Sequence, residues 1–136
     1  MLQVFLNGFH GDTSATFLVG EVDQKGVDLV GATKEAMHRA IQACGPGVPL
    51  NTIGQIISDF AKMNGYTTCR EFSGHGLGRQ FHEVPLIYHF ANDDDMPMME
   101  GMAFTIDEII KWPDEWTVVT KDGEVKLTIV LSDSVG

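Results

Sequence analysis

The sequence predicts an α+β fold, in which two main helices lie on one face of a mainly antiparallel sheet. Strand-like apolar runs occur near both ends of the chain, within residues 1–19 and 102–131. Between them lie two segments whose apolar residues recur at helical spacing, and the chain has no internal repeat. A chain of 136 residues can bury one core, so we expect a single domain over residues 1–136.

The first element is predicted to be a β-hairpin. Asn7-Gly8 separates two apolar runs, which is typical of a two-residue turn of type I′. The register that follows has three pairs: Leu6 with Phe9, Gln3 with Asp12, and Met1 with Ser14. Because side chains alternate along a strand, Met1 and Asp12 are expected on the same face. The Asp12 carboxylate is either a solvent-facing edge residue or a functional group. A strand that begins at residue 1 needs a neighbour, which suggests that the natural fold extends further toward the N-terminus.

Two helices are expected after the hairpin. The first covers about residues 27–44 and ends at Gly45-Pro46. The second begins with Asn51 as its N-cap and ends at Asn64-Gly65. Its apolar stripe is predicted to face the core: Ile53, Ile56, Ile57, Phe60 and Ala61.

The second half of the chain is predicted to be mostly strand. The expected strands cover residues 67–72, 102–109, 116–120 and 125–131. The last two surround a turn at residues 121–123. Asp107 is a carboxylate in the middle of one of these strands, as Asp12 is in the hairpin.

Composition and charge exclude several classes of partner. The formal net charge of −10 argues against binding to nucleic acid or to an anionic membrane surface, and it suits a site that collects cations. No apolar run approaches the ~20 residues that a membrane-spanning helix needs. The N-terminal residues lack the basic region of a signal peptide, and the chain has only two cysteines, so we expect a reduced, intracellular compartment.

The segment from Gly74 to Glu83 contains two glycine-flanked histidines, His75 and His82. A glycine-rich bend lets a metal ion or a substrate approach the main chain, and a neutral imidazole is a good metal ligand or proton donor. The alternative is a glycine-rich turn with two incidental histidines. A carboxylate in the hairpin and another on a later strand favour a metal site, because divalent ions bind carboxylate oxygens together with imidazole.

The chain resembles the type 1 methionine aminopeptidases. The resemblance lies in four segments, which occur in the same order as in the family: FLNGFHGDTS (residues 5–14), GHGLGRQFHE (74–83), EGMAFTI (100–106) and WTVVT (116–120). HFAND (89–93) is most similar to the organellar, mitochondrial subgroup. The resemblance implies a partial pita-bread (creatinase/aminopeptidase-like) fold, here as an N-terminally truncated catalytic domain in the cytoplasm or the mitochondrion.

The resemblance also implies an activity, cofactors and site residues. The activity is metal-dependent removal of the N-terminal methionine from nascent proteins or peptides, with two divalent ions (cobalt, manganese, iron or zinc) that polarise the peptide carbonyl and activate a hydroxide. The implied metal ligands are Asp12, His75 and Asp107. His82 corresponds to the catalytic histidine that hydrogen-bonds the substrate peptide. Phe81 and Trp116 correspond to walls of the methionine pocket, whereas His10 and His89 are interpreted as structural.

The chain departs from the family pattern at several metal-ligand positions. Met1 and Lys126 stand where the family has an aspartate and a glutamate, and neither side chain replaces a bridging carboxylate. Glu124 lies two residues before Lys126 and is an alternative ligand. Asp107 is one methylene shorter than the family's glutamate, and Glu108 replaces a proline. One ion or none is then expected in this chain. Two alternatives follow: an inactive truncated or spliced form that acts as a binding module or pairs with a full-length enzyme, and a proline-cleaving aminopeptidase of the same fold.

Overall fold

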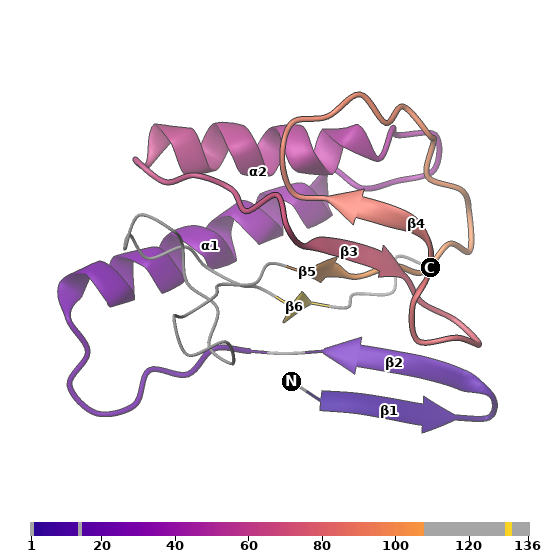
Figure 1. Cartoon of the computed structure of the whole chain (residues 1–136), viewed down its shortest axis with the longest axis horizontal. Coiled ribbons are helices and arrows are strands. Elements are labelled where there is room, and N and C mark those ends of the chain that lie inside the picture. The colour runs from indigo at the N-terminus through magenta and orange to yellow at the C-terminus, as the bar shows by residue number, and fades with distance from the viewer. Residues whose placement is uncertain (1, 14, 108–129, 132–136) are drawn as a thin grey trace.

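The computed structural model describes residues 2–13, 15–107 and 130–131. Figure 1 shows the elements in this part of the chain, in which a strand pair is followed by a pair of helices and then by two further strand pairs. Their bounds are β1 (Leu2–Leu6), β2 (Phe9–Thr13), α1 (Gln24–Gln42), α2 (Asn51–Met63), β3 (Ser73–Gly76), β4 (Glu83–Tyr88), β5 (Ile106–Asp107) and β6 (Val130–Leu131).

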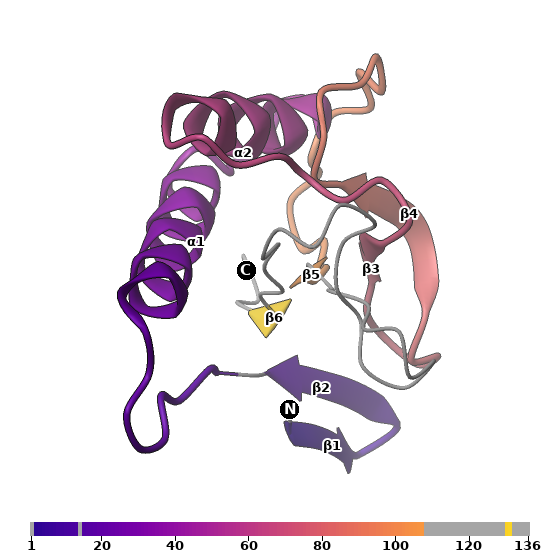
Figure 2. The ribbon, with the colours of Figure 1, turned by 60° about the vertical axis from the view of Figure 1, so that its left-hand side comes forward.

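The described strands form three antiparallel pairs: β1 with β2, β3 with β4, and β5 with β6. A bridge between Gly76 and Phe104 joins the second pair to the segment that leads into β5. Figure 2 shows both helices on one side of the molecule, with the strand pairs curving around the other side. The predicted α+β class, with antiparallel pairing and two main helices, is confirmed. Within the described ranges, no helix combines the length and apolar composition needed to cross a bilayer.

The hairpin has the predicted turn and register. Asn7 and Gly8 both have positive φ angles, 53° and 86°, as a type I′ turn requires. Leu6 pairs with Phe9 and Gln3 pairs with Asp12. The predicted partner pair of Met1 and Ser14 lies outside the described residues. Asp12 therefore has the position in β2 that the Asn-Gly turn predicts.

Both helices differ from prediction at their starts. Helix α1 begins at Gln24 because the Asp23 side chain accepts a hydrogen bond from the N–H of Gly26 at 2.8 Å, which caps the first turn. The prediction of Asn51 as the N-cap of α2 is wrong, because the preceding residue, Leu50, already has helical angles and no side chain caps this end. Main-chain carbonyls of residues 94 and 96 accept hydrogen bonds from Asn51 and Leu50 instead, at 3.0 and 2.9 Å. The predicted end at Asn64-Gly65 is confirmed, with Gly65 at φ 78°.

The predicted strand over residues 67–72 is wrong, because β3 begins only at Ser73. Ser73 pairs with Tyr88, the last residue of β4, so residues before Ser73 have passed the end of their partner strand. High strand propensity at Thr67 and Thr68 has little effect without such a partner. Of the predicted strand 102–109, the structure has Ile106–Asp107 as β5. The predicted strand 116–120 and the turn 121–123 lie outside the described residues, and 130–131 of the strand 125–131 form β6.

The core lies between α2 and the strands, and α2 contacts the main chain at the end of β4 through Gly54. Buried apolar residues from both helices, strands β4 and β5 and the segments next to them form one cluster: Ala40, Leu50, Ile53, Ile57, Ile87, Met98, Phe104 and Ile106. A Cβ atom at position 54 would overlap the carbonyl oxygen of Phe90 and lie 2.7 Å from that of Tyr88. The main chain that follows β4 therefore passes directly over the helix at this glycine.

His89 is fully buried in this core, directly after β4. Burial lowers the pKa of its imidazole from 6.5 to about 3, because the charged form loses its hydration. His89 is therefore neutral in the folded chain near pH 7, which agrees with its interpretation as a structural residue.

We expect Gly54→Ala to destabilise the fold by about 1–3 kcal/mol, because the added methyl group forces α2 away from the main chain after β4. Gly31→Ala is the matched control. Gly31 lies on the exposed side of α1, and a Cβ atom there meets nothing within 4 Å. This control should stabilise the chain by up to about 1 kcal/mol through helix propensity alone. Urea unfolding measures both values, and equal effects of the two substitutions would contradict the close packing at Gly54.

We also expect stability to fall as the pH drops below about 6.5. The unfolded state then binds a proton at residue 89 that the folded state does not bind, so each further pH unit costs at most about 1.4 kcal/mol for this one group. Urea unfolding of the wild type and of His89→Leu between pH 7 and 5 separates this contribution from those of other groups. An NMR titration in which His89 protonates near its ordinary pKa would contradict the assignment.

Candidate functional site

Asp12 contributes a buried carboxylate from strand β2. The residue is only 4% exposed, although the neighbouring strand β1 is exposed along its whole length. Its Oδ1 atom has no hydrogen-bond partner among the residues that the structure describes. A buried oxygen without a donor is costly, and for a carboxylate the cost is offset when a cation binds there. The reading of Asp12 as a solvent-facing edge residue is therefore wrong.

His75 lies on strand β3, and both its main-chain N–H and its carbonyl form hydrogen bonds with Thr105. The N–H of His75 donates to Thr105 Oγ1 at 3.1 Å, and the N–H of Thr105 donates to the carbonyl of His75 at 2.8 Å. The Nδ1 atom of His75 lies 3.0 Å from the carbonyl oxygen of Gly76. In the tautomer with its proton on Nδ1, the ring donates to this carbonyl and presents the Nε2 lone pair, the form that binds metal ions.

The glycines on either side of His75 allow close packing of the main chain. A Cβ atom at Gly74 would overlap the carbonyl oxygen of Thr105, and one at Gly76 would overlap the carbonyl oxygen of Val84. The space beside these glycines is thus filled by neighbouring main chain. The expectation that this space admits a metal ion or a substrate is wrong at both positions. Gly74 and Gly76 instead let three main-chain segments meet around His75.

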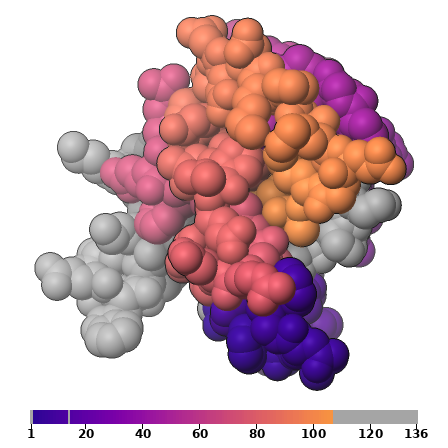
Figure 3. Space-filling model, turned by 90° about the vertical axis from the view of Figure 1, so that its right-hand side faces the viewer, coloured from indigo at the N-terminus to yellow at the C-terminus, as the bar shows by residue number. Residues whose placement is uncertain are grey.

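The loop between β3 and β4 carries Phe81 and His82. It is anchored from two directions, by a hydrogen bond from the N–H of Leu77 to the carbonyl of Ala103 at 3.0 Å and by one from His10 to Gly78 at 2.8 Å. Its own N–H at residue 80 donates to the Glu83 carboxylate at 2.7 Å. Figure 3 shows the N-terminal hairpin packed directly against this part of the chain.

The loop brings three of the predicted site residues together. The ring of His82 lies 4.3 Å from the ring of His75, edge-on at 77°. Phe81 contacts both, at 5.5 Å from His75 and 4.6 Å from His82. Phe81 is half-buried and His82 is exposed. His75, Phe81 and His82 thus form one cluster of rings with an open side.

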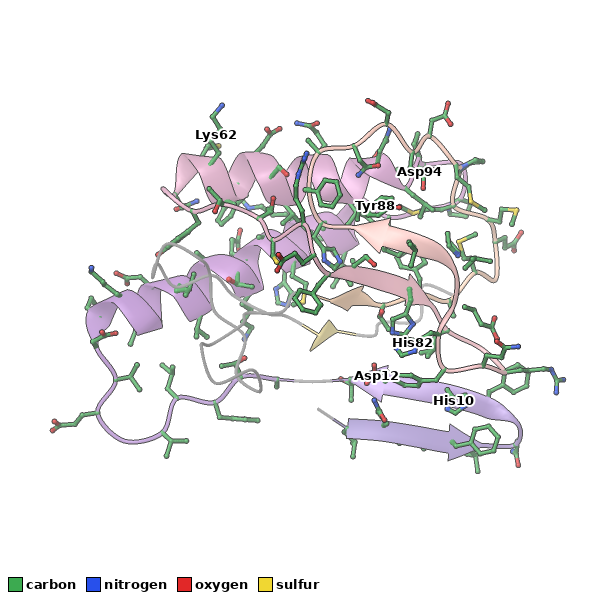
Figure 4. All side chains as sticks on the ribbon, in the orientation of Figure 1. His10, Asp12, Lys62, His82, Tyr88 and Asp94 are labelled. Carbon is green, nitrogen blue, oxygen red and sulfur yellow. The ribbon has the colours of Figure 1, made fainter. Side chains whose placement is uncertain are left out.

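Asp12 faces the same region as this ring cluster. His10 and Asp12 lie two residues apart on β2, so their side chains are on the same face of the strand. The His10 ring lies 5.6 Å from that of Phe81. In Figure 4, Asp12 points from β2 toward the loop that carries His82.

The remaining predicted site residues fall only partly within the described chain. The main chain of Asp107 belongs to β5, which follows Thr105 and pairs with β6. Trp116 lies outside the described residues, as do the positions of Met1, Lys126 and Glu124. No group of three or more His, Cys, Asp or Glu side chains placed to hold a metal ion occurs among the residues that the structure describes.

The chemistry of the two described donors fits a divalent ion. Asp12 supplies a buried carboxylate oxygen without a donor, and His75 supplies an imidazole whose Nδ1 lies within hydrogen-bond distance of the Gly76 carbonyl. Carboxylate and imidazole together suit manganese, iron, cobalt and zinc. The described residues therefore fit as part of a ligand set.

Two residues of this region were not predicted as part of the site. Thr105 is fully buried and fixes the main chain of His75. His10 was interpreted as structural and contacts Phe81. Its two-residue spacing from Asp12 in a predicted strand was the available signal, because it places both side chains on one face.

Comparison with known proteins identifies the family. Residues 2–133 match the model of metallopeptidase family M24. The human protein methionine aminopeptidase 1D, mitochondrial, is 48% identical over 131 residues, which cover 90% of this chain and 39% of that protein. This chain thus spans about two-fifths of the length of that relative.

Solved structures confirm the partial pita-bread fold. Methionine aminopeptidase from Rickettsia prowazekii superimposes with a TM-score of 0.81 and 33% identity, over 97% of this chain and 59% of that chain. Prolidase from Pyrococcus furiosus has a TM-score of 0.74 and 26% identity, over 97% of this chain and 35% of that chain. The buried Asp12, the anchored His75 and these matches lead to one conclusion: the chain belongs to metallopeptidase family M24.

Proposed function

We propose that this chain acts in the metal-dependent removal of N-terminal methionine from nascent proteins or peptides. The main structural support is the buried Oδ1 of Asp12, which has no donor within the described chain and faces the loop next to His75. Among the solved structures, identity of 33% to a methionine aminopeptidase, against 26% to a prolidase, favours methionine over proline-containing substrates.

The proposed metal ligands are Asp12, His75 and Asp107. A bound divalent ion (manganese, cobalt, iron or zinc) would supply Lewis-acid polarisation of the scissile carbonyl and an activated water. The residues of the chain orient the peptide and the ligands. Thr105 fixes the main chain of His75, and the Gly76 carbonyl lies within hydrogen-bond distance of Nδ1 of its ring.

His82 and Phe81 are the proposed substrate contacts within the described region. His82 is exposed, so its imidazole can hydrogen-bond the peptide while its ring edge rests against His75. Phe81 is half-buried and offers an apolar ring for a methionine side chain, with which sulfur–aromatic contact is favourable. Trp116 is proposed as the opposite wall. The substrates are peptide or nascent-protein N-termini, and the compartment is the mitochondrion or the cytoplasm.

A second candidate function follows from two residue identities. Met1 and Lys126 stand at positions where the resemblance implies carboxylate ligands, and a lysine ammonium repels a cation. In this second reading the chain binds N-terminal peptides without cleaving them, or pairs with a full-length enzyme. Metal binding and turnover separate the two candidates.

Loss of a residue that only supports a metal ligand typically weakens metal affinity by about 10–100-fold. We expect Asp12→Asn and His75→Gln each to weaken the affinity for Mn²⁺ by more than this, because both residues are proposed as direct ligands. Asp59→Asn on α2 and His38→Gln on α1 are matched controls, because both residues are exposed and remote from the ring cluster. Isothermal titration calorimetry measures the affinities. Unaltered Mn²⁺ affinity in Asp12→Asn would exclude this residue as a ligand.

We expect the folded chain to release methionine from the peptide Met-Ala-Ser when Mn²⁺ or Co²⁺ is present, and to lose this activity with EDTA. His82→Ala should lower kcat/KM by about 100-fold or more, as for loss of a positioned acid–base or hydrogen-bonding group. Chromatography of free methionine measures turnover. A folded chain that binds Mn²⁺ and the peptide without turnover would instead support the binding module, and cleavage of an X-Pro peptide alone would support the proline-cleaving alternative.

A further inference from the structure

His10 connects the N-terminal hairpin to the loop between β3 and β4 in two ways. Its main-chain N–H donates to the carbonyl of Gly78 at 2.8 Å. Its ring stands edge-on to the ring of Phe81, with centroids 5.6 Å apart and planes at 76°. One strand residue therefore contacts the loop at two points three residues apart.

The ring of Phe81 in turn contacts the rings of both site histidines. It lies 5.5 Å from the ring of His75 and 4.6 Å from the ring of His82, and these two imidazoles are 4.3 Å apart. Edge-on and tilted contacts of this kind are the favourable arrangements for aromatic rings. A displacement of Phe81 therefore reaches both imidazoles.

Phe5 supports the ring of His10 from the partner strand. The two residues pair directly across the hairpin, with ring centroids 4.6 Å apart. Phe5 is 63% exposed and belongs to no part of the core, so this ring contact is local to the hairpin. The register set by the Asn7-Gly8 turn thus determines where the His10 ring stands.

We propose that His10 is a positioning residue, which holds Phe81 and through it the relative orientation of His75 and His82. This inference rests on the proposed function in one respect, namely that Phe81 and His82 contact the peptide. The geometry requires a flat ring at position 10 and does not require a charge or a proton. A phenylalanine at position 10 should therefore serve nearly as well as the histidine.

The first test uses NMR on the chain without metal or peptide. The wild type should show a nuclear Overhauser effect between the ring protons of Phe81 and His75. His10→Ala should lose it, His10→Phe should retain it, and His38→Ala on the exposed side of α1 should not alter it. A retained Phe81–His75 effect in a folded His10→Ala variant would overturn the proposal.

The second test uses kinetics or peptide affinity. His10→Ala should raise KM for Met-Ala-Ser about two- to tenfold, as for loss of one edge-on ring contact, with little change in kcat. His10→Phe should restore the wild-type KM. Equal values of KM in wild type and His10→Ala would contradict the positioning role.

The outcomes separate this proposal from the proposed function. A wild type without turnover would overturn the proposed function only, because the NMR test does not need turnover. If His10→Ala does not fold, His10→Phe decides: a folded variant that keeps the Phe81–His75 effect supports the proposal, and one that has lost the effect overturns it.

Discussion

The close approach of three main-chain segments at β3 is the constraint on which the rest of the structure depends. Gly74 lets the main chain at Thr105 pass beside β3, and Gly76 does the same for Val84. Two hydrogen bonds between His75 and Thr105 then hold the segments together. A side chain at either glycine would overlap this neighbouring main chain and force one of the segments to shift. The glycines of the motif therefore allow close main-chain packing, and this packing fixes the main chain of His75.

The site gathers residues that are far apart in the chain. The hairpin contributes Asp12 near the start, β3 and its loop contribute His75 and His82, and the segment before β5 contributes Thr105. The burial of Asp12 carries a free-energy cost. A buried polar atom without a partner typically costs about 1–3 kcal/mol, and a fold retains that cost where a ligand removes it. We propose that the buried carboxylate of Asp12 and the imidazole of His75 are donors to a common cation.

Local sequence rules predicted those features that neighbouring residues determine. The Asn7-Gly8 turn predicted the hairpin register and so the face on which Asp12 lies, and Asn64-Gly65 predicted the end of α2. The start of α2 was not predictable in this way, because its free N–H groups are satisfied by main-chain carbonyls of residues 94 and 96, more than forty positions away. The strand predicted over 67–72 failed for the same reason, since its partner strand ends opposite Ser73.

The candidate site shows the same division. The motifs identified Asp12, His75 and His82 by their resemblance to a family, and the structure places the two histidine rings in contact. The involvement of His10 and Thr105 depends on contacts between segments about seventy and thirty residues apart, which no local pattern specifies. Trp116 lies outside the described residues and only the main chain of Asp107 is described, so their roles are proposals from the resemblance.

Paramagnetic NMR with Mn²⁺ tests the central claim, that Asp12 and His75 hold a common divalent ion. Mn²⁺ is paramagnetic and broadens the resonances of nuclei close to the site where it binds. The account predicts that substoichiometric Mn²⁺ broadens the resonances of Asp12 and His75 first, while those of His38 on α1 stay sharp. Broadening that begins at the acidic run of residues 93–95, with Asp12 and His75 unaffected, would contradict it.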